Sequence, residues 1–363
     1  MTATFDSSNC DTPFWLPGSH LQTLYGATLA RYHAIKFVRD RIETSDGDFI
    51  DIDWAGPGLF PHKSADNTQL RADAELANTA ARRWAQPQDW LNLPTDPQTQ
   101  AVVLFHGLEG SSASHYAQAI TQYFRARGWV VAVPHLRGCS GFTNRMARAY
   151  HSGDTEDLSF MLKSVVARLP SARWHAIGVS LGGNTLLRYL GTTSASEIPL
   201  VAAAGVSTPL DLVACGNQLS DSFAGRQLYG RYFLATMKRK VLEKAKRFPG
   251  LIDVLRFSHI KTLREFDDIY TAPMHGFRNA LDYWTRASSL PVLKDIAIPT
   301  LVLNARNDPF VPDASLPGPL DCSGAVLLHQ PADGGHVGFV SGGFPGHLNW
   351  LPGRLARYFE TYQ

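Results

Sequence analysis

The sequence predicts an α/β protein with a mostly parallel central sheet, helices on both faces of that sheet, and an inserted helical cap. Apolar runs without a polar face alternate with amphipathic stretches from residue 101 to residue 206, and again from residue 298 to the C-terminus. Strands covered on both faces read as such runs, so the alternation is typical of parallel sheets with helical crossovers. In addition, the apolar run 174–179 ends in a Gly-x-Ser-x-Gly turn that passes directly into a helical stretch.

Three segments precede this regular pattern. Residues 1–34 form an aromatic and proline-rich arm without a clear period, and we expect the arm to pack on the core. Two alternating runs between residues 35 and 54 flank Asp46 and Gly47, and they predict an antiparallel hairpin at an edge of the sheet. Residues 56–98 are rich in proline and contain an Ala-rich helical stretch at 70–84, which predicts a surface insertion.

The core is expected to comprise residues 35–208 and 291–363. Its predicted buried strands are 101–105, 129–133, 174–179, 200–206, 298–304 and 325–329. Its predicted helices are 114–127, 154–169, the stretch after the Gly-x-Ser-x-Gly turn, and 348–362. Acidic residues at the start of the helix 154–169 interact favourably with the positive end of the helix dipole, which supports the predicted helix start.

Residues 209–290 break the alternation and are mostly helical, so we interpret them as a cap over the sheet edge. The clearest helix in the cap, 227–247, carries apolar residues among seven lysines and arginines. A solvated helix face is the simpler interpretation of this basic run. Weak peripheral contact with anionic lipid headgroups is the alternative.

Ser180 is the candidate nucleophile, because it lies at the centre of the Gly-x-Ser-x-Gly turn. Gly178 and Gly182 allow a turn that is too tight for side chains, and the turn directs the Ser180 hydroxyl out of the sheet. The free N–H groups of the following helix would face charge that develops beside the hydroxyl. Ser207 also follows an apolar run, but it lacks the second glycine, so we interpret it as a strand end.

A serine nucleophile needs a base, and the base needs a carboxylate that orients it. Asp308 and His336 follow the last two predicted strands, whose carboxyl ends meet the Ser180 turn at one edge of the sheet. We therefore predict Ser180 as nucleophile, His336 as general base and then acid, and Asp308 as the orienting carboxylate. Asp211, which follows an earlier strand, and Asp333, which is close to His336 in sequence, are the alternative acids.

Two backbone N–H groups are candidates for the oxyanion hole. Leu181 follows the nucleophile, and Leu108 lies in the glycine-rich turn 106–110 after the first parallel strand. His106, His135 and His151 also lie in loops at this edge, but only His336 follows the final strand and is flanked by glycines.

Composition and motifs limit the classes of function that the sequence supports. The 363 residues are 44% hydrophobic and 18% charged with a net charge of +2, so no global field selects nucleic acid. The four cysteines lack metal-ligand spacing, and neither a nucleotide-binding loop nor an HExxH motif is present, so we expect no metal and no cofactor. We see no signal peptide and no apolar run long enough for a bilayer, which favours a cytoplasmic protein.

From residue 14 to the C-terminus, the chain resembles the α/β-hydrolase family 4 proteins, the YheT-like hydrolases. The matching stretches are Trp15-Leu-Pro-Gly-Ser-His-Leu-Gln-Thr23, His106-Gly-Leu-Glu-Gly110, His135-Leu-Arg-Gly-Cys-Ser-Gly141, Tyr150-His-Ser-Gly-Asp154, Gly178-Val-Ser-Leu-Gly-Gly-Asn184, Arg264-Glu-Phe-Asp-Asp268, Asn307-Asp-Pro309 and Gly335-His-Val-Gly-Phe339. The 56–98 insertion is longer than is usual in the family, and the N-terminal anchor of many eukaryotic members is not seen.

The resemblance implies the same three catalytic residues and the hydrolysis of carboxylic esters. Members act on short- to medium-chain acyl esters, some as phospholipases and some as acyltransferases that form ethyl esters. We therefore expect a serine esterase that acts on a small-molecule or lipid ester through an acyl-enzyme. The alternatives are an alcohol O-acyltransferase with the same residues and a non-catalytic relative that binds ligands.

Overall fold

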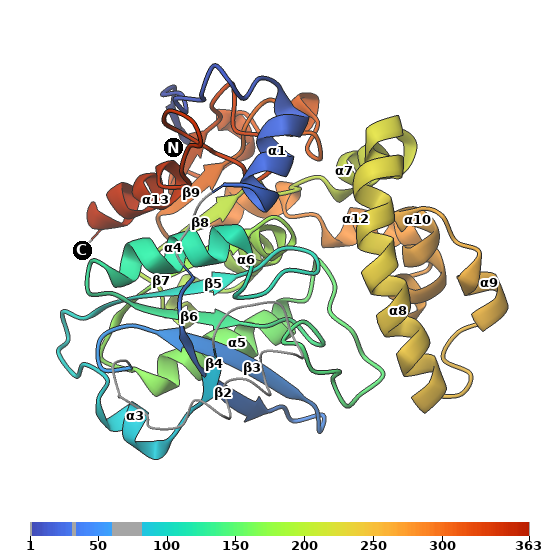
Figure 1. Cartoon of the computed structure of the whole chain (residues 1–363), viewed down its shortest axis with the longest axis horizontal. Helices are drawn as coiled ribbons and strands as arrows, with labels where there is room; N and C mark the ends of the chain where they lie inside the picture. The colour runs from blue at the N-terminus through green and yellow to red at the C-terminus, as the bar shows by residue number, and fades with distance from the viewer. Residues whose placement is uncertain (1, 31–33, 60–81, 363) are drawn as a thin grey trace.

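The computed structural model of the chain describes residues 2–30, 34–59 and 82–362 (Figure 1). Within these ranges ten strands form one sheet in the order β1-β10-β9-β8-β7-β5-β6-β3-β2-β4. The strands are β1 (Thr4–Asp6), β2 (Phe37–Glu43), β3 (Phe49–Ala55), β4 (Arg82–Trp84), β5 (Gln100–Phe105), β6 (Val130–Pro134), β7 (Arg173–Val179), β8 (Ala202–Val206), β9 (Thr300–Leu303) and β10 (Val326–His329). From β6 to β1 all neighbouring strands are parallel, so the predicted parallel core is confirmed.

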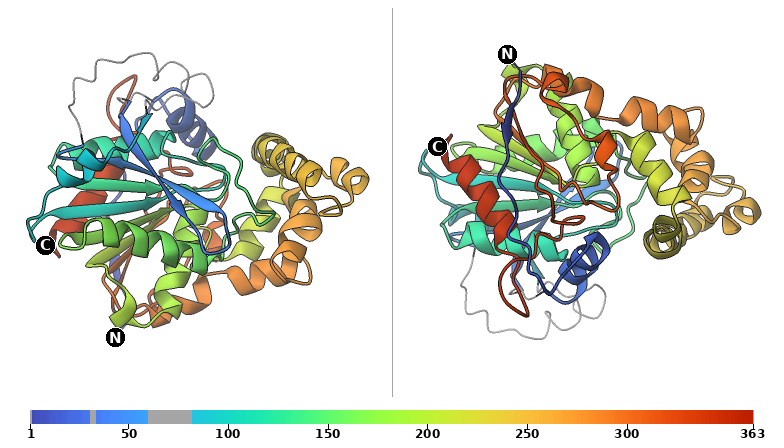
Figure 2. Two further views of the ribbon diagram at one scale, coloured as in Figure 1. Left: turned by 90° about the horizontal axis from the view of Figure 1, so that it is seen from below. Right: turned by 90° about the horizontal axis from the view of Figure 1, so that it is seen from above.

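Helices cover both faces of the sheet, as the apolar runs predict (Figure 2). The helices are α1 (Ser19–Thr28), α3 (Pro87–Leu91), α4 (His115–Arg125), α5 (Thr155–Arg168), α6 (Leu181–Thr192), α7 (Leu212–Asp221), α8 (Arg231–Arg247), α9 (Val254–Ser258), α10 (Leu263–Phe266), α11 (Ala272–Met274), α12 (Ala280–Ala287) and α13 (Trp350–Glu360). Phe124 of α4 and Phe359 of α13 belong to one apolar cluster, and Leu162 of α5 and Leu187 of α6 belong to the other. The two clusters lie on opposite faces of the sheet.

The predicted hairpin is present, but it does not form the edge of the sheet. Strands β2 and β3 pair antiparallel, and the turn between them contains Gly47 with φ 82°. Strand β4 pairs with the outer side of β2 and is the last strand. The predicted helix at 70–84 is wrong over Arg82–Trp84, which form β4; residues 70–81 lie outside the described residues. Three residues are too few to show a strand period, which explains the error.

The N-terminal arm contributes a strand and a helix. Strand β1 pairs in parallel with β10 and forms the opposite edge of the sheet. Helix α1 buries Gln22, Thr23 and Gly26 against the rest of the molecule. The sequence of this arm has no clear period, so it predicts no regular structure there. Its short elements are stabilised by long-range contacts rather than by a local pattern.

Residues 209–290, which we call the cap, contain α7 to α12 and lie to one side of the sheet (Figures 1 and 2). The cap has apolar clusters of its own, which include Phe257 and Phe266 in one cluster and Tyr283 and Trp284 in another. Among the described residues, no helix combines the length and the apolarity that crossing a bilayer requires.

A buried histidine in the core predicts that acid destabilises the protein. His175 of β7 is 0% exposed and packs against the rings of Trp129 and Phe359, at centroid distances of 5.0 and 4.8 Å. Burial lowers the pKa of His175 from 6.5 to about 4. Below pH 6.5 the unfolded state binds a proton at His175, whereas the folded state does so only near pH 4. The free energy of unfolding therefore falls as the pH drops from 6.5 toward 4. Between pH 7 and pH 5, we expect this residue to cost about 2 kcal/mol of unfolding free energy.

Urea unfolding at pH 7 and pH 5 measures this loss. The His175→Phe variant keeps an aromatic ring in the same apolar site, so it should lose about 2 kcal/mol less than the wild type over this pH interval. Equal losses in the two proteins would contradict the assignment.

Candidate active site

The turn between β7 and α6 has the backbone geometry that the Gly-x-Ser-x-Gly pattern predicts. Ser180 has φ 53° and ψ −120°, a conformation that residues other than glycine rarely adopt. A Cβ atom on Gly182 would lie 2.5 Å from the carbonyl oxygen of Phe105, and one on Gly178 would lie 2.5 Å from that of Gly182. Gly182 is therefore needed for the close approach of the turn to the end of β5, and Gly178 for the close approach of the start of α6 to β7.

Three side chains that are distant in sequence form one hydrogen-bonded chain at this edge of the sheet. Ser180 Oγ lies 3.0 Å from His336 Nε2, and His336 Nδ1 lies 2.8 Å from Asp308 Oδ2. Asp308 follows β9, and His336 follows β10. The predicted nucleophile, base and acid thus lie within hydrogen-bonding distance of one another.

The surroundings of Asp308 and His336 hold the two side chains in place. Asp308 is 6% exposed, and its Oδ1 accepts the backbone N–H groups of Phe310 and Val311 at 2.8 and 3.3 Å. The Phe310 ring stacks on the imidazole of His336, with 4.0 Å between the ring centroids. Asp308 therefore keeps Oδ2 directed at the imidazole.

The alternative acids are engaged elsewhere. Asp211 caps α7, where its carboxylate accepts the N–H groups of Val213 and Ala214 at 2.9 and 3.1 Å. Asp333 accepts a hydrogen bond from the side-chain amide of Asn307 at 2.7 Å. The geometry around His336 therefore favours Asp308.

The other histidines of this edge interact with the backbone. Each accepts an N–H group on a ring nitrogen: His106 from Leu136 at 3.1 Å, His135 from Ser112 at 3.2 Å and His151 from Gly153 at 3.1 Å. Ser207, interpreted from the sequence as a strand end, directly follows β8, and its Oγ accepts the N–H of Val337 at 3.0 Å. This second serine therefore supports the loop that carries His336.

Two residues of the N-terminal arm also position the site, a role that their sequence does not predict. Thr23 Oγ1 accepts the backbone N–H of His336 at 2.9 Å. Gln22 Oε1 accepts the side-chain amide of Asn307 at 2.9 Å and the N–H of Gly334 at 3.1 Å. The only sequence signal was the family-like stretch 15–23, which does not reveal what these residues contact.

The two candidate oxyanion donors lie beside Ser180. Leu181 is the first residue of α6, and a Cβ atom on Gly107 would lie 3.1 Å from the Ser180 Cβ atom, so the turn 106–110 contacts the nucleophile. Neither the Leu108 N–H nor the Leu181 N–H donates to an acceptor within the described ranges. Both groups therefore remain the candidates for binding a negatively charged oxygen beside Ser180.

Ser180 and His336 open into a cavity of about 170 Å³ between the sheet edge and the cap. Most of its lining residues belong to the cap, and many of these are apolar, including Leu212, Leu219, Phe233, Met237, Phe266 and Trp284. Charged side chains line one part of the wall, among them Glu109 and Lys240. A cavity of this kind can bury an acyl chain next to the Ser180 hydroxyl.

The basic helix of the cap is not simply a solvated face. Lys244 of α8 is 4% exposed, and Lys240 is half-buried. Both side chains contact the core, whereas Arg231, Arg239 and Lys246 are exposed. The solvated interpretation is therefore wrong for the two lysines, because a run of charges does not show which side of a helix meets a partner.

Comparisons with known proteins support the same assignment of fold. A family model described as the alpha/beta hydrolase fold matches residues 100–343. The predicted esterase YheT of Escherichia coli is 34% identical over 346 residues, which cover 94% of this chain and 90% of that protein. The mouse phospholipase ABHD3 is 30% identical over 339 residues, which cover 93% of this chain and 74% of that protein. The structure of the Pyrococcus furiosus esterase Pf2001 matches with a TM-score of 0.50 and 14% identity, covering 100% of this chain and 98% of the other.

Proposed function

Because this chain belongs to the α/β-hydrolase family, with the YheT-like hydrolases among its relatives, we propose that it is a serine hydrolase that cleaves carboxylic esters through an acyl-enzyme. The observation that carries the proposal is the chain of two hydrogen bonds from Ser180 through His336 to Asp308, at 3.0 and 2.8 Å. A serine hydroxyl at its ordinary pKa is a weak nucleophile, and this arrangement activates it.

The reaction begins with the attack of Ser180 Oγ on the ester carbonyl, while His336 Nε2 accepts the hydroxyl proton. Asp308 accepts the Nδ1–H of His336 and stabilises the imidazolium that forms. The negative charge on the former carbonyl oxygen is stabilised by the N–H groups of Leu181 and Leu108, which need no reorganisation because the turn and the helix hold them.

The tetrahedral intermediate then collapses, and His336 gives its proton to the departing alkoxide. Water that His336 deprotonates attacks the acyl-enzyme, and Ser180 recovers its proton as the acid leaves. An alcohol that reaches the acyl-enzyme before water would form a new ester by the same steps. The ratio of ester to acid formed in water–ethanol mixtures measures how the acyl-enzyme partitions between the two acceptors.

We propose short- to medium-chain acyl esters as the substrate class. The apolar walls of the cavity support this choice, and its limited volume restricts the length of the acyl chain. Across a series of p-nitrophenyl esters, an acyl chain that outgrows the cavity should lose at least about tenfold in kcat/KM. A kcat/KM that rises continuously up to palmitate would contradict the short- to medium-chain assignment.

Labelling with a fluorophosphonate probe tests the mechanism without assuming a substrate. The probe should modify the peptide that contains Ser180, as identified by mass spectrometry, because such probes react with activated serines. A wild-type protein that hydrolyses no ester and carries no label on Ser180 would instead be a non-catalytic relative.

A further inference from the structure

One face of helix α8 is held against the core by charge-assisted contacts. Lys240, Lys244 and Arg247 are four and three residues apart, so they lie on the same side of the helix. Lys244 Nζ donates to the carbonyl oxygens of Ala147 and Arg148 at 3.2 and 2.7 Å. This side of α8 is therefore the docking side of the cap.

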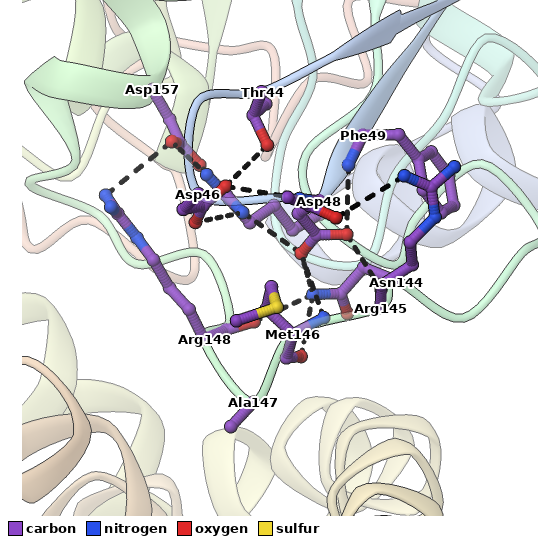
Figure 3. A network of polar contacts seen from close by, with 12 residues as sticks. Thr44, Asp46, Asp48, Phe49, Asn144, Arg145, Met146, Ala147, Arg148 and Asp157 are labelled. Carbon is purple, nitrogen blue, oxygen red and sulfur yellow. Dashed lines mark hydrogen bonds and ion pairs between the residues drawn. The ribbon is translucent and has the colours of Figure 1, made fainter.

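The core loop that receives these contacts is itself fixed by a buried carboxylate (Figure 3). Asp48 is 0% exposed; it accepts the N–H of Arg145 at 2.7 Å and the side-chain amide of Asn144 at 2.6 Å. Figure 3 shows Ala147 on the side of this loop that faces the cap helices, away from Asp48. Arg247 of α8 donates to the carbonyl oxygens of Asn144 and Arg145 at 3.0 and 2.9 Å. The loop thus presents N–H groups to Asp48 and carbonyl groups to α8.

Lys240 is the contact of this face that reaches the active site. Its Nζ lies 2.8 Å from Glu109 Oε2 and 2.9 Å from Oε1, and the side chains of Lys240 and Glu109 are 31% and 7% exposed. Tyr150 donates its hydroxyl to the same carboxylate at 2.7 Å and accepts the Glu109 N–H at 3.1 Å. Burial alone would lower the pKa of Lys240, but Cys139 and Glu109 raise it overall, so Lys240 carries a charge at neutral pH.

Glu109 is bonded directly to Leu108 in the turn that contacts Ser180. Its φ of 56° is unusual for a residue other than glycine, so the surrounding contacts must hold the turn in this conformation. Lys240 and Tyr150 hold the Glu109 carboxylate, and Tyr150 also accepts the Glu109 N–H group.

We propose that Lys240 is a positioning residue: from the cap, its ammonium group holds the Glu109 carboxylate and so fixes the turn whose Leu108 N–H completes the oxyanion hole. The inference rests on the proposed function. The ion pair between Lys240 and Glu109 then couples docking of the cap on the core to stabilisation of the transition state. Removal of the ammonium leaves the nearly buried Glu109 carboxylate without its counter-ion, and the turn relaxes toward solvent.

The test compares two lysines of the same helix. Lys240→Met removes the contact with Glu109, whereas Lys238→Met removes contacts with the carbonyl oxygens of Ser258 and Ile260 inside the cap. With p-nitrophenyl butyrate, we expect Lys240→Met to lower kcat by about 10- to 100-fold with little change in KM, because a misplaced oxyanion donor acts on the transition state. Lys238→Met should keep the wild-type kcat.

A trifluoromethyl ketone, which forms a tetrahedral adduct with an active serine, supplies a second readout. Its affinity for Lys240→Met should fall by about the same factor as kcat. Glu109→Gln keeps the size of the side chain but removes the charge that Lys240 binds, so it should reproduce the loss in kcat. The double variant should be little worse than either single one, because the two residues act as a pair.

Four results would overturn the inference: an unchanged kcat in both Lys240→Met and Glu109→Gln, an equal loss in Lys238→Met, a loss confined to KM, or additive losses in the double variant. These outcomes are distinct from failure of the proposed function. In that case the wild-type protein itself would neither hydrolyse esters nor accept a fluorophosphonate label on Ser180.

Discussion

Replacing Ser180 with alanine is expected to lower kcat on p-nitrophenyl acyl esters by at least about 10⁴-fold. The variant keeps the cavity and the oxyanion donors, but it lacks the oxygen that lies 3.0 Å from His336 Nε2. No acyl-enzyme can then form. His336→Ala should be nearly as inactive, because a hydroxyl without its base is not nucleophilic at neutral pH. Steady-state hydrolysis measures both variants. The expected loss requires an assay that detects about 10⁻⁵ of the wild-type rate.

The double variant Ser180→Ala/His336→Ala sharpens this result. Residues that act as a unit show non-additive losses, so it should be no slower than the worse single variant. Ser194→Ala serves as the matched control, because Ser194 is exposed and its hydroxyl contacts only Ser196 among the described residues. Retention of more than about a hundredth of the rate in Ser180→Ala would move the nucleophile elsewhere.

Asp308→Asn should lower kcat by about 10³- to 10⁴-fold while the protein stays folded. The amide has nearly the size of the carboxylate, so the acceptor for the Phe310 N–H is kept. An amide cannot stabilise the imidazolium of His336, and it can force the ring into the wrong tautomer. Comparison of kcat at saturating substrate, with the circular dichroism spectrum as a check on folding, isolates this effect.

Asp211→Asn is the matched control for this variant, because it makes the same chemical change in the acid that sequence reasoning retained as an alternative. Asp211 caps α7, and asparagine caps helices almost as well as aspartate, so both kcat and stability should stay close to those of the wild type. Near-normal activity of Asp308→Asn together with an inactive Asp211→Asn would reverse the assignment of the acid.

Sequence reasoning works best for the turn around Ser180, since the determinants of that turn are local. The positive φ of Ser180 and the close backbone contacts of Gly178 and Gly182 follow from the five-residue Gly-x-Ser-x-Gly pattern. The strand before this turn and the helix after it are also visible as hydrophobic patterns in the sequence. The parallel core is also predicted, because strands that are buried on both faces must be apolar throughout. The prediction of Ser180, Asp308 and His336 as the catalytic residues follows from the same logic, since the loops after successive strands meet at one edge.

The elements that the sequence analysis missed are short and depend on distant partners. Strands β1 and β4 have three residues each, and each forms an edge only because a longer strand is already present to pair with it. Thr23 and Gln22 support the His336 and Asn307 loops across more than 280 residues of sequence, and no local pattern records such a contact.

The sequence by itself determined the strand–turn–helix that carries Ser180 and the alternation that builds the sheet, because both arise from the sterics and burial of neighbouring residues. Only the tertiary structure decided that Asp308 rather than Asp211 faces His336, and that Lys240 and Lys244 turn toward the core. The sequence favours Asp308 but leaves Asp211 and Asp333 as alternatives, and it does not show which side of a helix meets the core. Hydrogen bonds and ion pairs between segments that only folding brings together make both choices.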